Sequence, residues 1–264
     1  MNLHLDDKLA LVTGSTAGIG YAIAKTLAAE GARVIINGRT EDRVAAAVTA
    51  IRAEVPTARL ESLALDFAEP AAADAVVERF PGIDVLVNNL GVYGPKPFDA
   101  ITDADWLGII QTNFLSGVRL SRAYLPRMKA RNWGRIVFIS SESGVNIPVE
   151  MIHYGVTKTM QIALARGLAE CTTGTGVTVN SVLAGPTRSE GVEVFIASMA
   201  KDKGITPAEV EKQFFQTVRP SSLIQRFATT DEVAALVAYV ASPVSAATNG
   251  AALRAEGGLV RSIL

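Results

Sequence analysis

The chain has 264 residues, of which 49% are hydrophobic and 19% are charged, a composition typical of a globular protein with a large core. Its 25 basic and 26 acidic residues form no blocks and give a formal net charge of -1, which argues against a protein that binds nucleic acid or an anionic membrane. No apolar run reaches the roughly 20 residues needed to cross a bilayer. With one cysteine, Cys171, and no signal-peptide pattern, we expect a single cytoplasmic domain spanning residues 1–264.

Short apolar runs alternate with amphipathic stretches through the first half of the chain. The apolar runs lack polar alternation, as expected for strands buried on both faces, and the intervening stretches are long enough for right-handed helical crossovers. The sequence therefore predicts an α/β fold with a doubly wound parallel sheet. The predicted strands are Leu9–Thr13, Arg33–Asn37, Leu60–Leu65 and Asp84–Asn88, and the predicted helices are Ala17–Glu30, Glu41–Ala53 and Ala71–Phe80.

The second half begins with two long predicted helices, Asp103–Ala130 and His153–Cys171, each followed by a strand, Arg135–Ile139 and Val177–Val182. The rhythm then breaks between about residues 185 and 224, as in a variable substrate loop or lid. Helix Asp231–Ala241 and strand Ala251–Ala255 follow. Four apolar residues of the variable stretch could form either a substrate wall or the core of a helical lid: Phe195, Met199, Phe214 and Phe215.

A glycine-rich turn joins the first predicted strand to the first predicted helix. Glycines here let the backbone turn tightly and approach a pyrophosphate, which the N–H groups at the helix start can bind. An ordinary tight turn is the competing interpretation, but the position in a βαβ unit favours a dinucleotide site. The candidate cofactor residues of this turn are Gly14, Ser15, Thr16, Gly18, Ile19 and Gly20.

The end of the second strand carries no acidic residue that would bind the adenosine ribose hydroxyls and repel a 2′-phosphate. Instead Arg39 offers a fork of donors to a phosphate, Thr40 offers a hydroxyl, and Gly38 leaves room. We therefore expect NADP(H) as the preferred cofactor. NAD(H) stays possible if Arg39 is only a solvated loop residue.

Residues after the third and fourth strands extend the candidate cofactor site. Asp66, followed by Phe67, is placed to receive the adenine amino group, although a helix-capping role competes. Asn88 and Gly91 end the fourth strand, where they could line the carboxyl edge of the sheet.

Tyr154 and Lys158 are one helical turn apart and so lie on one helix face. Alone, such a pair is commonly a surface feature. Beside an ammonium, however, a phenol has a lowered pKa and becomes a usable acid or base. Ser141 follows an apolar strand and could bond a substrate oxygen, whereas alternation along the strand would point Ser140 to the other face.

These residues, in this order and spacing, identify a resemblance to the short-chain dehydrogenase/reductases over essentially the whole chain. The motifs that carry it are Thr13-Gly14-x-x-x-Gly18-Ile19-Gly20, Asn88-Asn89-x-Gly91, Asn113, Ser141, Tyr154-x-x-x-Lys158 and Asn180. The resemblance implies a Rossmann-type fold, with Tyr154 as general acid/base and Ser141 polarising the carbonyl. Lys158 would hold the nicotinamide ribose and lower the Tyr154 pKa. Asn113 would bend its helix and hold a water that links Lys158 to solvent.

Two departures from the family pattern affect the cofactor end. Leu90 replaces the usual alanine and would crowd the nicotinamide side or displace its loop. Residues 184–187 read Ala-Gly-Pro-Thr, which keeps Gly185 and Thr187 as cofactor-binding candidates.

The leading hypothesis is an NADP(H)-dependent oxidoreductase that interconverts a small-molecule carbonyl and alcohol. A 3-oxoacyl carrier-protein reductase ranks second, and a dinucleotide-binding regulator without turnover ranks third. The only local basic concentration for an acidic carrier is Arg127, Lys129, Arg131 and Arg135. With two histidines and one cysteine, no metal site is expected. The family resemblance implies a homotetramer, with a dimer next.

Overall fold

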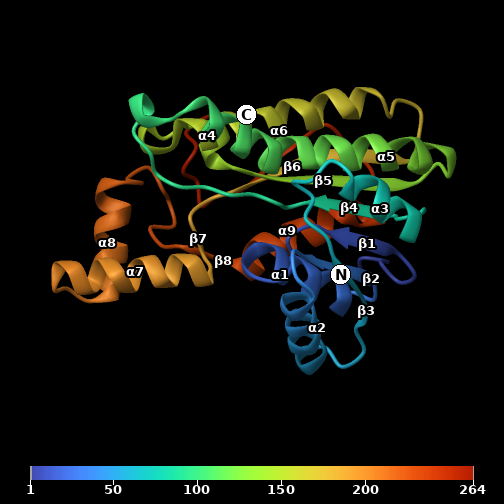
Figure 1. Cartoon of the computed structure of the whole chain (residues 1–264), viewed down its shortest axis with the longest axis horizontal. Helices are drawn as coiled ribbons and strands as arrows, with labels where there is room; N and C mark the ends of the chain where they lie inside the picture. The colour runs from blue at the N-terminus through green and yellow to red at the C-terminus, as the bar shows by residue number, and fades with distance from the viewer. Residues whose placement is uncertain (1, 264) are drawn as a thin grey trace.

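A computed structural model of the chain describes residues 2–263. Seven strands form one parallel sheet: β1 (Leu9–Val12), β2 (Arg33–Gly38), β3 (Arg59–Ala64), β4 (Val85–Asn88), β5 (Gly134–Ser141), β6 (Val177–Ala184) and β9 (Ala252–Ala255). Their order across the sheet is β3-β2-β1-β4-β5-β6-β9 (Figure 1), so the direction of winding reverses between β1 and β4. The predicted Rossmann-type, doubly wound sheet is confirmed.

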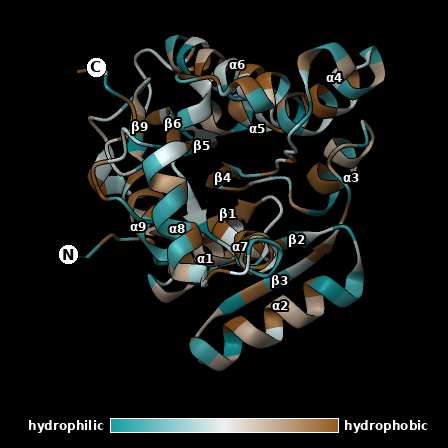
Figure 2. Cartoon of the chain, turned by 90° about the vertical axis from the view of Figure 1, so that its left-hand side faces the viewer, coloured by the Kyte–Doolittle hydropathy of each residue, from teal (hydrophilic) through white to brown (hydrophobic). Residues whose placement is uncertain are grey.

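Helices cover both faces of the sheet. The helices are α1 (Gly18–Ala29), α2 (Glu41–Glu54), α3 (Ala72–Arg79), α4 (Asp103–Ile110), α5 (Ser116–Ala130), α6 (Ile152–Glu170) and α9 (Thr230–Ala241). One apolar cluster joins α1, α2 and α9 to one face, and a second joins α3, α5 and α6 to the other. Figure 2 shows these layers by hydropathy, with the strands between the helices.

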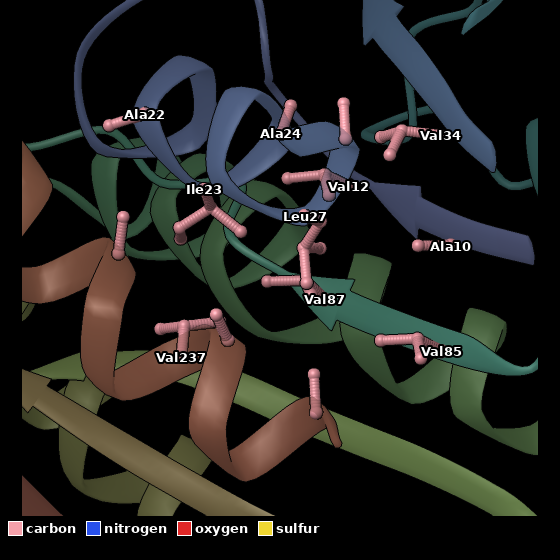
Figure 3. Packing of buried hydrophobic residues seen from close by; sticks show 14 of the residues in the cluster. Ala10, Val12, Ala22, Ile23, Ala24, Leu27, Val34, Val85, Val87 and Val237 are labelled. Atoms are coloured by element: carbon pink, nitrogen blue, oxygen red, sulfur yellow. The ribbon is translucent and has the colours of Figure 1, made fainter. Parts of the chain in front are cut away.

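Successive strand residues enter opposite clusters, which explains the unbroken apolar runs in the sequence. In β1, Ala10 and Val12 face α1 together with Val85 and Val87 of β4 (Figure 3). Leu11 faces the other cluster. Because both faces are covered, every residue of β1 is buried. The strands therefore end at fixed positions along one edge, where the candidate site residues follow them.

The long helix predicted over 103–130 is interrupted. Residues Gln111–Leu115 form a π-helical turn between α4 and α5, and Asn113 lies inside it. A π turn adds a residue to the helical repeat and locally reorients the chain. The hydroxyl of Ser116 donates to the Thr112 carbonyl at 2.6 Å just after it.

The insertion, residues 185–224, forms its own small helical layer. It contains strand β7 (Thr187–Arg188) and helices α7 (Glu190–Lys203) and α8 (Pro207–Thr217), and β7 pairs with β8 (Ala228–Thr229). Phe215 is buried between the helices, with Met199 and Phe214 packed against the same cluster, whereas Phe195 is 51% exposed. Three of the four apolar residues therefore build the helical core, and Phe195 alone stays available as a wall.

No helix among residues 2–263 is long and apolar enough to span a membrane.

Candidate active site and dinucleotide site

The turn between β1 and α1 requires its glycines. Gly14 and Gly18 have φ values of 62° and 57°, in the left-handed region that L side chains rarely adopt. A Cβ on Gly20 would lie 2.4 Å from both the Asn89 Nδ2 and the Gly14 carbonyl oxygen. The turn can therefore adopt this backbone conformation only with glycine at these positions.

The start of α1 suits an anion. Its N-cap residue, Ala17, provides no side-chain hydrogen bond, and the first turn holds no acidic residue. The first N–H groups of a helix lack partners within the helix, and the dipole there favours negative charge. The residues present therefore fit the pyrophosphate of a dinucleotide, and Thr16, Gly18 and Ile19 lie at this helix start.

Ser15 belongs to the scaffold of the turn. It is fully buried, and its hydroxyl donates to the Val12 carbonyl at 2.8 Å and accepts from the Asn37 N–H at 2.9 Å. Asn37 in turn accepts from the Gly14 N–H at 3.0 Å. Because its N–H also donates to the Asn37 carbonyl at 2.9 Å, both polar hydrogens of Ser15 are used within the turn.

Thr13 and Asn89 hold the turn from the side of β4. The Thr13 hydroxyl oxygen accepts from the Asn89 and Leu90 N–H groups at 2.9 and 3.0 Å. The Asn89 amide donates to the Thr13 and Gly14 carbonyls. Leu90 packs on the turn, since its Cδ1 lies 3.3 Å from where a Gly14 Cβ would be. The substitution of leucine for alanine thus narrows the space over Gly14.

The end of β2 is open to solvent. Arg39 and Thr40 are exposed, and the Thr40 hydroxyl accepts from the Arg43 N–H as the N-cap of α2. The room that Gly38 leaves is occupied by Thr16, because a Gly38 Cβ would lie 2.5 Å from the Thr16 Cγ2. Gly38 thus makes room for Thr16, rather than for a phosphate as expected.

Three predicted cofactor residues turn their side chains elsewhere. Asp66 accepts from the Ala68 N–H at 3.0 Å, an Asx turn ahead of α3, rather than capping the helix itself. Phe67 is buried in the core. Asn88 donates to Ser121 Oγ on α5 at 3.3 Å. Phe67 therefore offers a cofactor only its backbone, whereas the Oδ1 atom of Asn88 is buried without a hydrogen-bond partner.

Ser141, Tyr154 and Lys158 come together at the carboxyl end of β5. The Ser141 hydroxyl acts on the Tyr154 phenol, whose pKa it lowers. Lys158 Nζ lies 5.6 Å from the Tyr154 ring centroid and donates to the Ile139 carbonyl at 2.8 Å. Ser140 instead donates to the Lys158 carbonyl at 2.9 Å. The two serines thus point to different sides of the strand, as alternation predicts.

Two glycines allow α6 to pack close to β5. A Cβ on Gly144 would lie 2.9 Å from the Lys158 carbonyl carbon, and one on Gly155 would lie 2.8 Å from the Ser143 carbonyl oxygen. The Thr159 hydroxyl adds a hydrogen bond of 2.7 Å to the Gly144 carbonyl. This close packing brings the side chains of α6 against the end of the strand.

Burial determines the acid–base character of both α6 residues. It raises the pKa of the Tyr154 phenol; Ser141 opposes this shift, and the charge of Glu142 reinforces it. Burial lowers the pKa of Lys158 to about 8. The expected lowering of the Tyr154 pKa by Lys158 is therefore not observed, because loss of solvation outweighs the other effects.

Asn113 is linked to Lys158 by Gln161, which sequence reasoning missed. Lys158 Nζ donates to Gln161 Oε1 at 3.2 Å, and Gln161 Nε2 donates to the Asn113 carbonyl. The Asn113 side chain bonds the Val92 backbone and the Thr157 hydroxyl. A side-chain amide thus connects Lys158 to Asn113 directly. Gly91 lies against Lys158, since a Cβ added to Gly91 would be 3.3 Å from Lys158 Nζ.

The remaining cofactor candidates lie after β6. The Thr187 hydroxyl donates to the Gly185 carbonyl at 2.8 Å and is buried. A Cβ on Gly185 would lie 2.7 Å from the Glu256 Cα, so this position also requires glycine. Both residues lie at the same carboxyl edge of the sheet as Ser141, which is the register partner of Ala184.

The basic residues considered for an acidic carrier lie at the opposite edge. Arg135 is the second residue of β5, is almost fully buried and donates to three backbone carbonyls. Arg127, Lys129 and Arg131, at the end of α5, donate to the carbonyls of Ala123, Cys171 and Ile83, respectively. Since Ser141 ends the same strand that Arg135 begins, these residues do not form a basic surface beside the site. Among residues 2–263, no group of three or more His, Cys, Asp or Glu is placed to hold a metal ion.

The chain matches the short chain dehydrogenase family model over residues 8–200. The chain belongs to this family. It is 46% identical to the uncharacterized oxidoreductase YvaG of Bacillus subtilis (strain 168) over 263 residues, covering 100% of both chains. As a short-chain dehydrogenase it is an oxidoreductase that acts on CH–OH groups with a nicotinamide dinucleotide.

Solved short-chain dehydrogenase structures share the fold. An L-sorbose reductase from Gluconobacter frateurii, complexed with NADPH and L-sorbose, has a TM-score of 0.92 at 29% identity and covers 100% of both chains. A 7α-hydroxysteroid dehydrogenase complexed with NADH has a TM-score of 0.83 at 28% identity, covering 100% of this chain and 98% of the other. The fold therefore accommodates either cofactor and both sugar and steroid substrates.

Proposed function

We propose that the protein is an NADP(H)-dependent oxidoreductase that interconverts a carbonyl and a primary or secondary alcohol, with Tyr154 as general acid and base. The observation that carries this proposal is the buried Lys158 ammonium 5.6 Å from the Tyr154 ring centroid, with Ser141 at the end of strand β5, against which α6 packs. A protein that only binds a dinucleotide has no chemical need for these three side chains together with Asn113.

A bound nicotinamide would supply or accept the hydride. Tyr154 would donate its proton to the substrate oxygen during reduction and take it back during oxidation. Ser141 would orient and polarise the same oxygen as charge develops. Because burial raises the Tyr154 pKa, the phenol is protonated at neutral pH, which suits reduction. Lys158 would hold the ribose of the cofactor.

NADP(H) is the proposed preference because the end of β2 offers Arg39 and Thr40 to solvent and carries no acid. The NADPH complex of the similar L-sorbose reductase supports it. NAD(H) is the alternative, given the NADH complex of the similar hydroxysteroid dehydrogenase. We further propose one domain over residues 1–264, in which the insertion is the substrate loop.

The experiment is turnover of a ketone and aldehyde panel with NADPH by wild type and by Tyr154→Phe. Loss of the phenol proton should lower kcat about 10²–10⁴-fold. Tyr239→Phe, on α9 at the other face of the sheet, is the matched control and should leave kcat unchanged. A 3-oxoacyl thioester in the panel tests the carrier-protein alternative. Tight NADPH binding without turnover would favour the regulator instead.

A further inference from the structure

Arg219 of the insertion reaches the carboxylate of Glu142, the residue after Ser141. Arg219 Nε donates to Glu142 Oε1 at 3.1 Å, and its Nη1 donates to Glu150 Oε1 at 3.3 Å. The other oxygen of Glu142, Oε2, accepts the hydroxyl of Ser141. A continuous series of polar contacts therefore runs from the insertion to the serine of the candidate site.

The ion pair in this series is buried. The Glu142 and Arg219 side chains keep only 5% and 13% of their exposure. Removing one member of a buried pair leaves an uncompensated charge, so each residue depends strongly on the other. The N–H and hydroxyl of Ser143 also donate to Glu142 Oε2, which holds the carboxylate in one orientation.

Ser141 has one hydroxyl proton, and Glu142 accepts it. The same oxygen accepts from the Ser143 N–H at 3.1 Å and keeps one lone pair for a further donor. A carboxylate that holds this proton strongly would withhold it from a substrate oxygen. Arg219, by binding Oε1, draws negative charge away from Oε2 and weakens its hold on the serine proton.

We propose that Arg219 and Glu142 are a positioning pair that couples the insertion to Ser141 and Tyr154. When Arg219 is paired with Glu142, Ser141 can donate its proton to the substrate. The positive charge of Arg219 also offsets the negative charge that Glu142 places beside the Tyr154 phenol. This inference rests on the proposed function, because the pair acts through the proposed roles of Ser141 and Tyr154.

Groups from several elements face Tyr154. They are Ser141 of β5, Glu142 beyond it, Tyr93 in the loop after β4 and Lys158 on α6. Glu142 brings the negative charge, and Arg219 is the cation paired with it. Removing Arg219 should therefore raise the Tyr154 pKa, and removing the charge of Glu142 should lower it.

The test is the pH profile of alcohol oxidation, which requires the deprotonated phenol. Arg219→Gln should lower kcat for oxidation about tenfold and shift the rising limb of the pH–rate profile to higher pH by about one unit. Glu142→Gln should shift this limb to lower pH. Arg219→Lys, which keeps the charge, should restore the wild-type limb. In the Glu142→Gln background, Arg219→Gln should have little further effect.

Arg226→Gln is the control, since Arg226 follows the insertion and pairs with Glu232 at the start of α9 rather than with Glu142. An unchanged limb in Arg219→Gln, or the same shift in Arg226→Gln, overturns the proposal. Circular dichroism confirms that each variant is folded.

Hydrogen exchange tests the coupling without turnover. Because α8 leads directly into Arg219, Glu142→Gln should increase exchange over residues 207–217 as much as Arg219→Gln does. An unchanged α8 in Glu142→Gln overturns the coupling even if no substrate is found. Coupled exchange in a protein that turns over no substrate would instead reject the proposed function and retain the pair.

Discussion

Lys158 and Gln161 are hydrogen bonded within one turn of α6, where the lysine ammonium donates to the glutamine oxygen at 3.2 Å. Gln161→Met should keep the shape but leave the buried ammonium with one acceptor fewer, costing about 1–3 kcal/mol of stability. The lysine should also lose its fixed position, so KM for the dinucleotide should rise more than KM for the substrate. Steady-state kinetics and urea unfolding measure both effects. Gln213→Met, on the exposed face of α8, is the control; equal effects in the two variants would contradict the positioning role.

The lowered pKa of Lys158 makes stability depend on pH. Burial shifts the pKa from 10.5 to about 8, so between these values the unfolded chain binds a proton that the folded protein does not. Stability must therefore rise with pH across this window, and the full cost of the buried cation, about 3 kcal/mol, applies below pH 8. We predict that Lys158→Met is more stable than wild type at pH 7 and that the difference shrinks toward pH 10. A difference independent of pH, measured by urea unfolding, would refute the shift.

Gly20 tolerates no side chain, because its Cβ would overlap the Asn89 amide and the Gly14 carbonyl oxygen. Gly20→Ala should cost about 1–3 kcal/mol and prevent dinucleotide binding, as seen by protein fluorescence. Gly94→Ala introduces the same methyl group where nothing lies within 4 Å and should change stability by less than about 0.5 kcal/mol. Normal NADPH binding by Gly20→Ala would show that the turn adjusts.

Arg39 is the proposed partner of the 2′-phosphate. Arg39→Ala should weaken NADPH binding about 10- to 100-fold, as expected for loss of charge-assisted hydrogen bonds, and leave NADH binding nearly unchanged. Arg52→Ala, in the last turn of α2, removes the same charge at the far end of the helix that follows Arg39 and should leave both affinities unchanged. If wild type binds NADH as tightly as NADPH, the cofactor preference is wrong.

We also predict a homotetramer, in which α4, α5 and α6 pair between subunits and β9 pairs across another axis. Leu107 on α4 is 69% exposed in the single chain, and β9 is an edge of the sheet. Light scattering after size-exclusion chromatography should give four chain masses at micromolar concentration. A monomer would exclude the assembly.

The fold was largely predictable because local signals and burial agree. The predicted strands and helices recur within a few residues, since strands covered on both faces leave an unbroken apolar run. Two strands are longer than predicted: β5 continues through Ser141 instead of ending at Ile139, and β6 continues through Ala184 instead of Val182. The family resemblance implies a bend at Asn113, and a π turn lies there, although no local pattern in the sequence marks it.

The candidate site was predictable where a short motif carries the chemistry, as with Tyr154 and Lys158. It was not predictable where a polar side chain could face either way. Ser15 and Asn88 have the residue types of a cofactor site, but distant partners turn their side chains inward. Glu142 and Arg219 are 77 positions apart, so no spacing rule could pair them.

The turn after β1 is tied down by side chains from three strands or their ends, through Thr13, Asn37 and Asn89. A loop already confined to one conformation has little chain entropy left to lose when a ligand arrives. Cofactor association should therefore be limited by encounter rather than by rearrangement of this turn.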